Sequence, residues 1–420
     1  MAVKDYNELP ILGNEFFNEK YHNLSSFNMV LWSYSDEVNY LTDDLLQELK
    51  DTKLIRYSTQ VLQYHNTLKA ILCNAIQSEL GSRQYIAVSL NNNTFNNIPE
   101  RYNPVGITSR VFRNIIEWLA QSDYIDLYKA LRGSHVDVQS VFRVTNKLRD
   151  LINGYEIGYS DLAIHRGSEP IQLKRAKKLA DYEDNQSIHA DRLLLKQYEE
   201  LLNSAKTHIT IEGKRIRSRT KVKRNFIEDF KKHGRIYSGE WQNCKSELRQ
   251  SITLNGKDTV EIDIVNCSLR MALQLSKIQI HHSDLYTIKD HPRDVVKQAI
   301  NIMFNTGNVR SPLQGIDRAS KALAEQLKTY ERSYLKEVVQ DCYEHYSMIA
   351  DEWFFQSRGL DLQFLDSRVC IKVIEEFTRI DKIVLTVHDS FIVCKDDEAL
   401  LRDSIIKNYH FIIEDLPVLR

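Results

Sequence analysis

The stretch that decides the fold is residues 259–273, TVEIDIVNCSLRMAL. Val260 and Ile262 alternate with polar residues as in a half-buried β-strand, and the second half of the stretch carries apolar residues at helical spacing. Asp263 stands where the predicted strand ends. We therefore expect its carboxylate to point out from a sheet edge, a position suited to holding a divalent cation.

A second informative stretch is residues 291–307, HPRDVVKQAINIMFNTG. Pro292 is favoured at the first turn of a helix, and Gly307 is placed to end one. One stripe of this helix is polar, and the opposite stripe is apolar and expected to face inward. The polar stripe holds Arg293, Lys297, Asn301 and, one turn on, Phe304 or Asn305. Two cations and an amide one turn apart can run along a triphosphate, although spacing alone favours an ordinary solvent-facing stripe.

The third stretch is residues 382–394, KIVLTVHDSFIVC. Two apolar strands flank His388, Asp389 and Ser390, which are predicted to form the turn of a hairpin. Asp and Ser are ordinary turn residues, so this stretch alone does not indicate a function.

Composition limits how the chain can bind a nucleotide. Its 420 residues are enough for two or three domains, and 14 glycines and seven prolines are half or less of the usual ~7% and ~5%. This scarcity excludes collagen-like and low-complexity chains and argues against an all-β sandwich. Neither Gly213-Lys214 nor Gly256-Lys257 has the surroundings of a Walker A loop. Side chains and a metal ion would have to hold any phosphates.

Charge and cysteine content are those of an ordinary intracellular protein. The net charge is −1, so any attraction for nucleic acid must be local. The six cysteines are widely spaced without a CxxC pair, which indicates reduced thiols. No apolar stretch approaches the ~20 residues of a membrane span. We expect a soluble cytoplasmic protein with no membrane partner.

The N-terminal part is predicted to contain two regions. Residues 1–84 are predicted to be a helical region, because LTDDLLQELK and VLQYHNTLKAILCNAI place apolar residues at helical spacing. Residues 85–153 are predicted to be winged-helix-like and nucleic-acid-binding. A helix capped by Thr108 is followed there by a short strand, Gly133 and an alternating strand over 136–144. An ordinary helix followed by a hairpin fits the same order equally well.

Residues 154–229 are predicted to be a helical connector with a basic run. Between Lys214 and Arg235 there are ten Lys or Arg, against only Glu228 and Asp229. Such a run is commonly a solvated face, but it is also where a phosphate backbone would bind. The candidates for nucleic-acid contact in this run are Arg215, Arg217, Arg219, Lys221, Lys223, Arg224 and Arg235.

In this order, the three stretches resemble the palm and fingers motifs of family A DNA polymerases and phage-type single-subunit RNA polymerases. DIVNCSLR, from Asp263 to Arg270, is similar to the first motif of the family. Arg293-x-x-x-Lys297 resembles the start of the fingers helix. VHDSF, around Asp389, resembles the third motif and is closer to the RNA polymerase branch, since the DNA branch usually has Glu after the Asp.

The resemblance covers about residues 230–400. Upstream, GRIY at residues 234–237, with Gln242, Asn243 and Arg249, resembles the stretch that contacts primer and template in the family. The implied fold is α+β and mostly helical. It would contain a right-hand polymerase palm, with a small antiparallel sheet, and a helical fingers element, together forming the polymerase core over residues 230–420.

The resemblance also implies an activity, template-directed nucleotidyl transfer with two Mg²⁺ ions, for which Mn²⁺ can substitute. Asp263 and Asp389 would bind the metals. Arg293 and Lys297 would neutralise the β- and γ-phosphates, and Lys297 would protonate the leaving pyrophosphate. His388 would position the primer terminus. The implied partners are a DNA template, nucleoside triphosphates and an RNA primer or product, in a bacterial or phage-infected cell.

The sequence departs from the family at the positions that read the sugar. Ser268 stands where the DNA branch has a bulky Glu, and Asn301 and Asn305 stand where the family has aromatic residues, with Phe304 adjacent. The small Ser268 favours ribonucleotide use, for priming or transcription. The candidates for nucleotide contact are Arg293, Lys297, Asn301, Phe304, Asn305, Ser268 and Arg270.

Three other functions remain open from the sequence. The protein could be a DNA polymerase that uses only deoxynucleotides, a template-independent nucleotide-adding enzyme, or a non-catalytic replication initiator or DNA-binding regulator. Two further elements are candidates for the nucleotide pocket or primer contact. These are Asp284 to Tyr286 before the fingers helix, and Gln363, Asp366 and Ser367 before the third motif.

Overall fold

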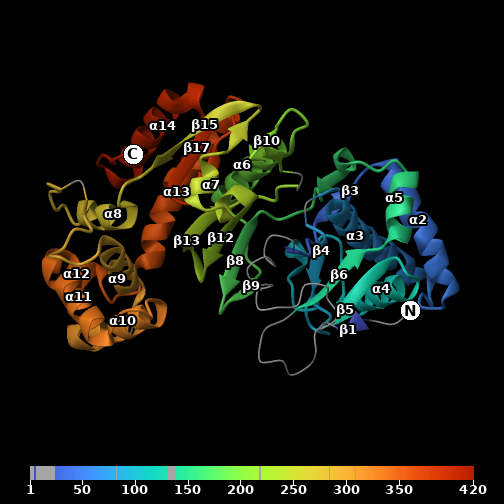
Figure 1. Ribbon diagram of the computed structural model, residues 1–420, viewed down its shortest axis with the longest axis horizontal. Helices are drawn as coiled ribbons and strands as arrows, with labels where there is room; N and C mark the ends of the chain where they lie inside the picture. Colours follow the sequence, from blue (N-terminus) through green and yellow to red (C-terminus); the bar gives the residue numbers. More distant parts are fainter. Residues whose placement is uncertain are drawn as a thin grey trace. The chain divides into compact units, whose positions relative to one another are not determined.

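The computed structural model of the chain is an α+β structure with several small sheets (Figure 1). It describes residues 4–5, 24–81, 83–129, 139–216, 219–282, 284–307 and 309–420. The chain divides into two compact units. Unit 1 comprises residues 1–169, 179–181 and 216–221, and unit 2 comprises residues 170–178, 182–215 and 222–420.

Unit 1 is a five-stranded mixed sheet with helices packed on it. The strands in spatial order are β1 (Lys4–Asp5), β5 (Ile125–Lys129), β6 (Ser140–Val144), β4 (Tyr85–Val88) and β2 (Leu24–Ser26). A second small sheet pairs β3 (Leu31–Ser33) with β7 (Leu162–Ile164). The helices are α2 (Asp36–Asp51), α3 (Val61–Leu80), α4 (Ser109–Gln121) and α5 (Asn146–Gly154). Apolar faces of these helices and strands form one continuous core.

The predicted winged-helix order is present in unit 1, but its setting differs from that of a winged helix. Helix α4 follows Thr108, and β5 and β6 form an antiparallel pair after it. Strand β6 also pairs with β4, so the β5–β6 pair lies inside the sheet and is not a free wing. Gly133 and residues 136–138 lie outside the described residues. The region 1–84 also contains strands β2 and β3 beside the expected helices. These short strands pair with β4 and β7, which lie far along the chain, so the local sequence pattern did not predict them.

Unit 2 holds the remaining elements. Its strands are β8 (Ile171–Arg175), β9 (Lys178–Ala180, at the boundary with unit 1), β10 (Ile209–Ile211), β11 (Lys214–Arg215), β12 (Lys223–Ile227), β13 (Asp229–Tyr237), β14 (Thr253–Leu254), β15 (Lys257–Asp263), β16 (Leu385–Val387) and β17 (Ser390–Cys394). Its helices are α6 (Gln186–Asn203), α7 (Ser246–Arg249), α8 (Cys267–Leu275), α9 (Arg293–Asn305), α10 (Pro312–Gln326), α11 (Arg332–His345), α12 (Ser347–Trp353), α13 (Gly359–Arg379) and α14 (Glu398–Ile413).

The segment expected to be a helical connector is only partly helical. Helix α6 lies within it, but residues 171–180 form β8 and β9, and the basic run forms β11, β12 and part of β13. The reason is visible in the burial of β8, where Ile171 and Leu173 are fully buried and alternate with polar residues. This period of two over five residues is a strand signal that the surrounding charged residues obscure.

The central sheet of unit 2 positions the candidate site. Its strand order is β11-β10-β14-β15-β17-β16. Strand β15 is set by a tight hairpin in which Asn255 and Gly256 both have positive φ, as a two-residue turn requires. Strand β17 pairs antiparallel with β15, and Asp263 lies opposite Ser390. Helix α13 packs against β13, and α10 and α11 pack against α9 (Figure 1).

Candidate active site

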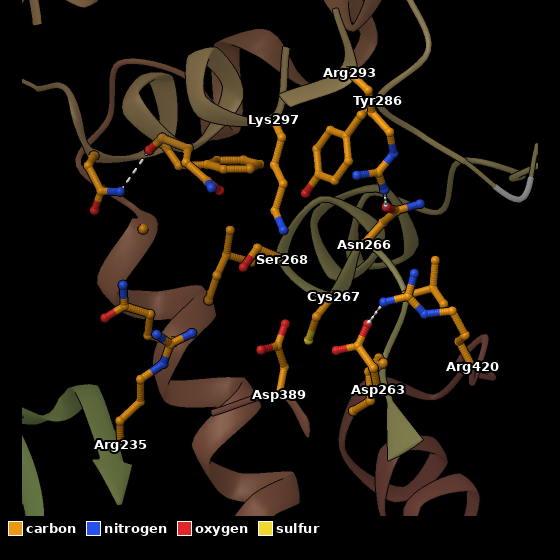
Figure 2. Close-up of a pocket in the computed structure, with 18 residues that line it drawn as sticks. Arg235, Asp263, Asn266, Cys267, Ser268, Tyr286, Arg293, Lys297, Asp389 and Arg420 are labelled. Atoms are coloured by element: carbon orange, nitrogen blue, oxygen red, sulfur yellow. Dashed lines mark hydrogen bonds and ion pairs between the residues drawn. The ribbon is translucent and has the colours of Figure 1, made fainter. Parts of the chain in front are cut away.

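The candidate site is a cavity of about 430 Å³ within unit 2. Figure 2 shows Asp263 and Asp389 facing the same space, with the Lys297 side chain extending toward them from α9. Residues from β13, β15, α8, α9, α13 and the β16–β17 turn line it. The lining residues that the sequence analysis singled out are Arg235, Asp263, Ser268, Tyr286, Arg293, Lys297, Asn301, Phe304, Asn305, Gln363 and Asp389.

The two aspartates meet because of strand register. Asp263 is the last residue of β15, and Asp389 ends the two-residue loop between β16 and β17. His388, the first loop residue, has a φ of 59°, which the tight turn requires. The backbone N–H of Ile264 donates to the Asp389 carbonyl at 3.1 Å. The hairpin and the end of β15 therefore present both carboxylates at one edge of the sheet.

The two carboxylates form a site that favours positive charge. Burial, and then the neighbouring charge of Asp389, raise the pKa of Asp263 to about 6, while Arg420 and Lys297 oppose this shift. The described residues contain no group of three or more His, Cys, Asp or Glu arranged to hold a metal ion. A Mg²⁺ ion here would have these two hard carboxylate ligands and would complete its shell with water and substrate phosphates, which is how Mg²⁺ is commonly bound.

Helix α9 supplies the cationic wall of the cavity. Arg293, Lys297, Asn301 and Asn305 are exposed along one stripe and line the cavity. Val296, Ile300 and Met303 are fully buried on the opposite stripe. The predicted division of this helix into a polar and an apolar face is therefore confirmed. Phe304 lines the cavity too, but it is only 2% exposed and packs against Phe354.

Arg293 is held in place by residues outside its own helix. Its Nε donates to Asp284 Oδ2 at 2.7 Å, and its Nη2 donates to Asn266 Oδ1 at 3.4 Å. Its guanidinium also lies over the Tyr286 ring, 5.3 Å from the centroid. Asp284 thus acts on the cavity through Arg293, whereas Tyr286 lines the cavity directly. Lys297, by contrast, makes no hydrogen bond or ion pair within the part of the chain that is described.

Helix α8 directs its N-terminus into the cavity. Asn266, which precedes the helix, has a left-handed conformation with a φ of 56°. This turn brings Asn266, Cys267 and Ser268 to the cavity wall. Backbone N–H groups at a helix N-terminus attract anions. Burial raises the pKa of the Cys267 thiol well above its ordinary value, which favours the neutral thiol.

Among the predicted catalytic and nucleotide-binding residues, Arg270 and His388 lie outside the cavity lining. Arg270 is 4% exposed, and its Nε donates to the Val265 carbonyl at 3.2 Å, so it stabilises the turn before α8. His388 packs edge-on to Tyr237, with ring centroids 6.0 Å apart. Burial and then Arg235 lower the pKa of His388, which favours a neutral imidazole.

The basic run is spread over different environments. Arg224 is buried and bonds to Asp191, to the Gly234 carbonyl and to Ser367. Arg219 lies in unit 1, where it stacks on Tyr159. Lys223 and Lys221 are partly buried, Arg215 is exposed, Arg235 lines the cavity, and Arg217 lies outside the described residues.

The upstream residues expected to contact primer and template are also placed differently from one another. Gln242 donates to the backbone carbonyls of Ile236 and Thr386, so it joins β13 to the β16–β17 hairpin. Arg249 makes a two-nitrogen contact with the Glu261 carboxylate, with its Nη2 2.8 Å from Oε1. Asn243 is exposed.

Sequence reasoning missed Arg420 and the contact that holds Arg235. The Arg420 guanidinium lies 3.6 Å from Asp263 Oδ2 and lines the cavity. Arg235 pairs with the buried Asp366, with Nε 3.3 Å from Oδ2. Both pairs join segments more than 100 residues apart, so no local pattern could reveal them.

Comparisons with known proteins do not identify the chain. No protein-family model matches the sequence, and no curated protein matches it. Among the described residues, no helix is both long enough and apolar enough to cross a membrane.

Proposed function

We propose that the protein is a nucleotidyltransferase of the polymerase type, which adds nucleotides to a strand under the direction of a DNA template. One observation carries the proposal: Asp263 at the end of β15 and Asp389 in the adjoining β16–β17 turn share a cavity with the Arg293–Lys297 face of α9. In this proposal the sheet around β15 and β17 is the palm, and α9 with α10 and α11 is the fingers element.

The arrangement suits transfer to an α-phosphate. A strand 3′-hydroxyl releases its proton to water and attacks the α-phosphorus, the bond to the bridging oxygen breaks, and pyrophosphate leaves. Bound at Asp263 and Asp389, two Mg²⁺ ions would lower the pKa of the hydroxyl and stabilise the charge on the attacking and leaving oxygens. Arg293 and Lys297 neutralise the β- and γ-phosphates, and the Lys297 ammonium donates a proton to the leaving pyrophosphate. The N-terminus of α8 would face the bound triphosphate, where its backbone N–H groups favour negative charge.

The same cavity supports the use of ribonucleotides. Ser268 is small and lines the wall near the two carboxylates, so no bulky side chain occupies that position. Amide side chains of Asn301 and Asn305 line the adjoining part of α9, where they can donate to hydroxyl groups. We therefore propose ribonucleoside triphosphates as the preferred substrates.

The proposal is tested by nucleotide incorporation. Purified protein with Mg²⁺ and a primed or unprimed DNA template is given labelled ribonucleotides or deoxyribonucleotides. Incorporation is expected to follow the template, and Asp263→Asn and Asp389→Asn are each expected to reduce the rate by about a thousandfold, or about 4 kcal/mol. Asp258→Asn, at an exposed position of the same strand, is the matched control and should retain full activity.

Each alternative function predicts a distinct result. Homopolymer formation regardless of template would indicate template-independent addition. Exclusive use of deoxynucleotides would indicate a DNA polymerase. No incorporation under any condition, or full activity in both aspartate variants, would contradict the proposal.

A further inference from the structure

Residues 418–420 form an additional strand-like pairing beside the proposed metal ligands. The backbone N–H of Asp263 donates to the Arg420 carbonyl at 3.0 Å, and the N–H of Arg420 donates to the Asp263 carbonyl at 3.0 Å. The N–H of Val265 donates to Val418 at 2.8 Å, and Ile264 and Leu419 form an antiparallel bridge. Asp263 is therefore fixed by β17 on one side and by residues 418–420 on the other.

This register determines where the Arg420 side chain goes. Residues that exchange both backbone hydrogen bonds lie directly opposite each other in an antiparallel pair, and their side chains share a face. The Arg420 guanidinium consequently reaches the Asp263 carboxylate, with Nη2 3.6 Å from Oδ2 (Figure 2). A slip of one residue would place the uncharged Leu419 opposite Asp263. The ion pair thus follows from the backbone pairing and not from a chance surface contact.

The position of Arg420 matters because Asp263 and Asp389 repel each other. A cation near them relieves this repulsion, and either a guanidinium or a divalent metal can do so. Arg420 lines the same cavity as both carboxylates. Its side chain is 82% exposed, so it can leave Asp263 without disturbing the core.

We propose that Arg420 is the internal counter-ion of the metal-free site and competes with the divalent metal for Asp263. This inference rests on the proposed function, because it assumes that Asp263 and Asp389 bind the metal. Arg420 is a positioning residue that acts through Asp263, and it sets a lower metal affinity than the two carboxylates alone would give.

The test measures Mn²⁺ binding to the full chain at pH 8, without nucleotide or nucleic acid, from the electron paramagnetic resonance signal of the free ion. Arg420→Ala is expected to bind Mn²⁺ about two- to fivefold more tightly, as the loss of a solvent-screened competing charge would give. Arg420→Lys keeps the charge and should bind like the unaltered protein. Arg332→Ala, which removes another exposed, ion-paired arginine of unit 2, is the matched control and should change nothing.

The variants distinguish the role of Arg420 from the metal site of the proposed function. If Arg420 had only a structural role, Arg420→Ala would weaken Mn²⁺ binding by loosening Asp263, and such a weakening, or no change, overturns the inference. Asp263→Asn and Asp389→Asn test the premise in the same assay, since each should weaken Mn²⁺ binding strongly. Unchanged affinity in both aspartate variants would overturn the metal site of the proposed function, and the inference with it.

Discussion

At the scale of single residues, the least expected feature of unit 2 is the buried carboxylate of Asp366. It lies on α13 and is 2% exposed, and its Oδ1 has no hydrogen-bond partner among the described residues. Its Oδ2 faces Arg235 Nε at 3.3 Å. Burial raises the pKa of Asp366 to about 7, although Arg235 acts in the opposite direction. Asp366 therefore orients a cavity arginine at a cost in stability.

The raised pKa of Asp366 should make the free energy of unfolding depend on pH. An unfolded Asp loses its proton near pH 4, but folded Asp366 keeps it up to about pH 7. Between these values the folded state binds more protons, so the free energy of unfolding falls as pH rises, by at most about 1.4 kcal/mol per pH unit for one group. Asp366→Asn should reduce this fall, which urea unfolding between pH 4.5 and 8 measures. Asp263, whose pKa is also raised, should keep part of the slope in the variant.

The control for this prediction is Asp361→Asn, a partly exposed carboxylate on the same helix. It should leave the pH dependence of unfolding unchanged. If Asp366→Asn unfolds with the same pH dependence as the unaltered protein, Asp366 ionises normally, and its burial does not control its charge.

At the scale of elements, the site depends on the close approach of α13 to the end of α9. A methyl group placed on Gly359 would lie 2.3 Å from Asn305 Oδ1, so only glycine fits there without moving Asn305. Asn305 in turn donates to the Asn301 carbonyl at 2.7 Å. These contacts fix the amide side chains that line the cavity.

Gly359→Ala is therefore expected to act on substrate binding more than on stability. The Asn305 amide group is at the end of a flexible side chain and can rotate away from the added methyl group, so the melting temperature should change little. Loss of one hydrogen bond to the nucleotide, about 0.5–1.5 kcal/mol, should raise the nucleotide KM about two- to tenfold. Gly154→Ala in α5, where a methyl group meets nothing within 4 Å, is the control. An unchanged KM in Gly359→Ala would show that Asn305 does not contact substrate.

Arg224, a basic residue of β12, stabilises the fold by linking several elements of unit 2. Its guanidinium joins β12 to Asp191 of α6 at 2.5 Å, to the Gly234 carbonyl of β13 at 2.9 Å and to Ser367 of α13 at 3.2 Å. Arg224→Ala would leave Asp191 without its partner, and we expect a loss of about 3–5 kcal/mol in unfolding free energy. The exposed Arg215→Ala should cost less than about 0.5 kcal/mol. Equal stability of the two variants in urea unfolding would contradict this role.

The strand end at Asp263, the two-faced helix α9 and the turn at Asp389 are local patterns, and the structure contains all three. Strand β8 was missed because charged residues obscure its short alternation, although its pairing with β12 is explicit in the structure. Arg420 was equally hidden, since its place follows from backbone pairing across more than 150 residues.

At the scale of the whole molecule, the balanced charge limits how strongly the protein can hold nucleic acid. The net charge is −1, and several members of the basic run are committed to other contacts. Unit 2 still has basic residues of this run that can reach solvent outside the cavity. Among the described residues these are Lys214, Arg215, Lys223, Lys231 and Lys232.

We therefore expect a moderate salt dependence of DNA binding. With about five phosphate contacts, the logarithm of the binding constant should fall with the logarithm of salt concentration with a slope of about −4 to −5. A titration by fluorescence anisotropy at several salt concentrations measures this slope. A slope near −9 would mean that all ten basic residues between 214 and 235 contact phosphates, which the burial of Arg224 contradicts.

The most direct test of the central claim is a crystal structure with Mn²⁺ and a non-hydrolysable ribonucleoside triphosphate, read by anomalous scattering from the metal. We expect anomalous peaks at the Asp263 and Asp389 carboxylates, with the triphosphate along Arg293 and Lys297 and the ribose near Ser268. Metal and triphosphate bound elsewhere, or no metal at the two aspartates with the triphosphate present, would contradict it.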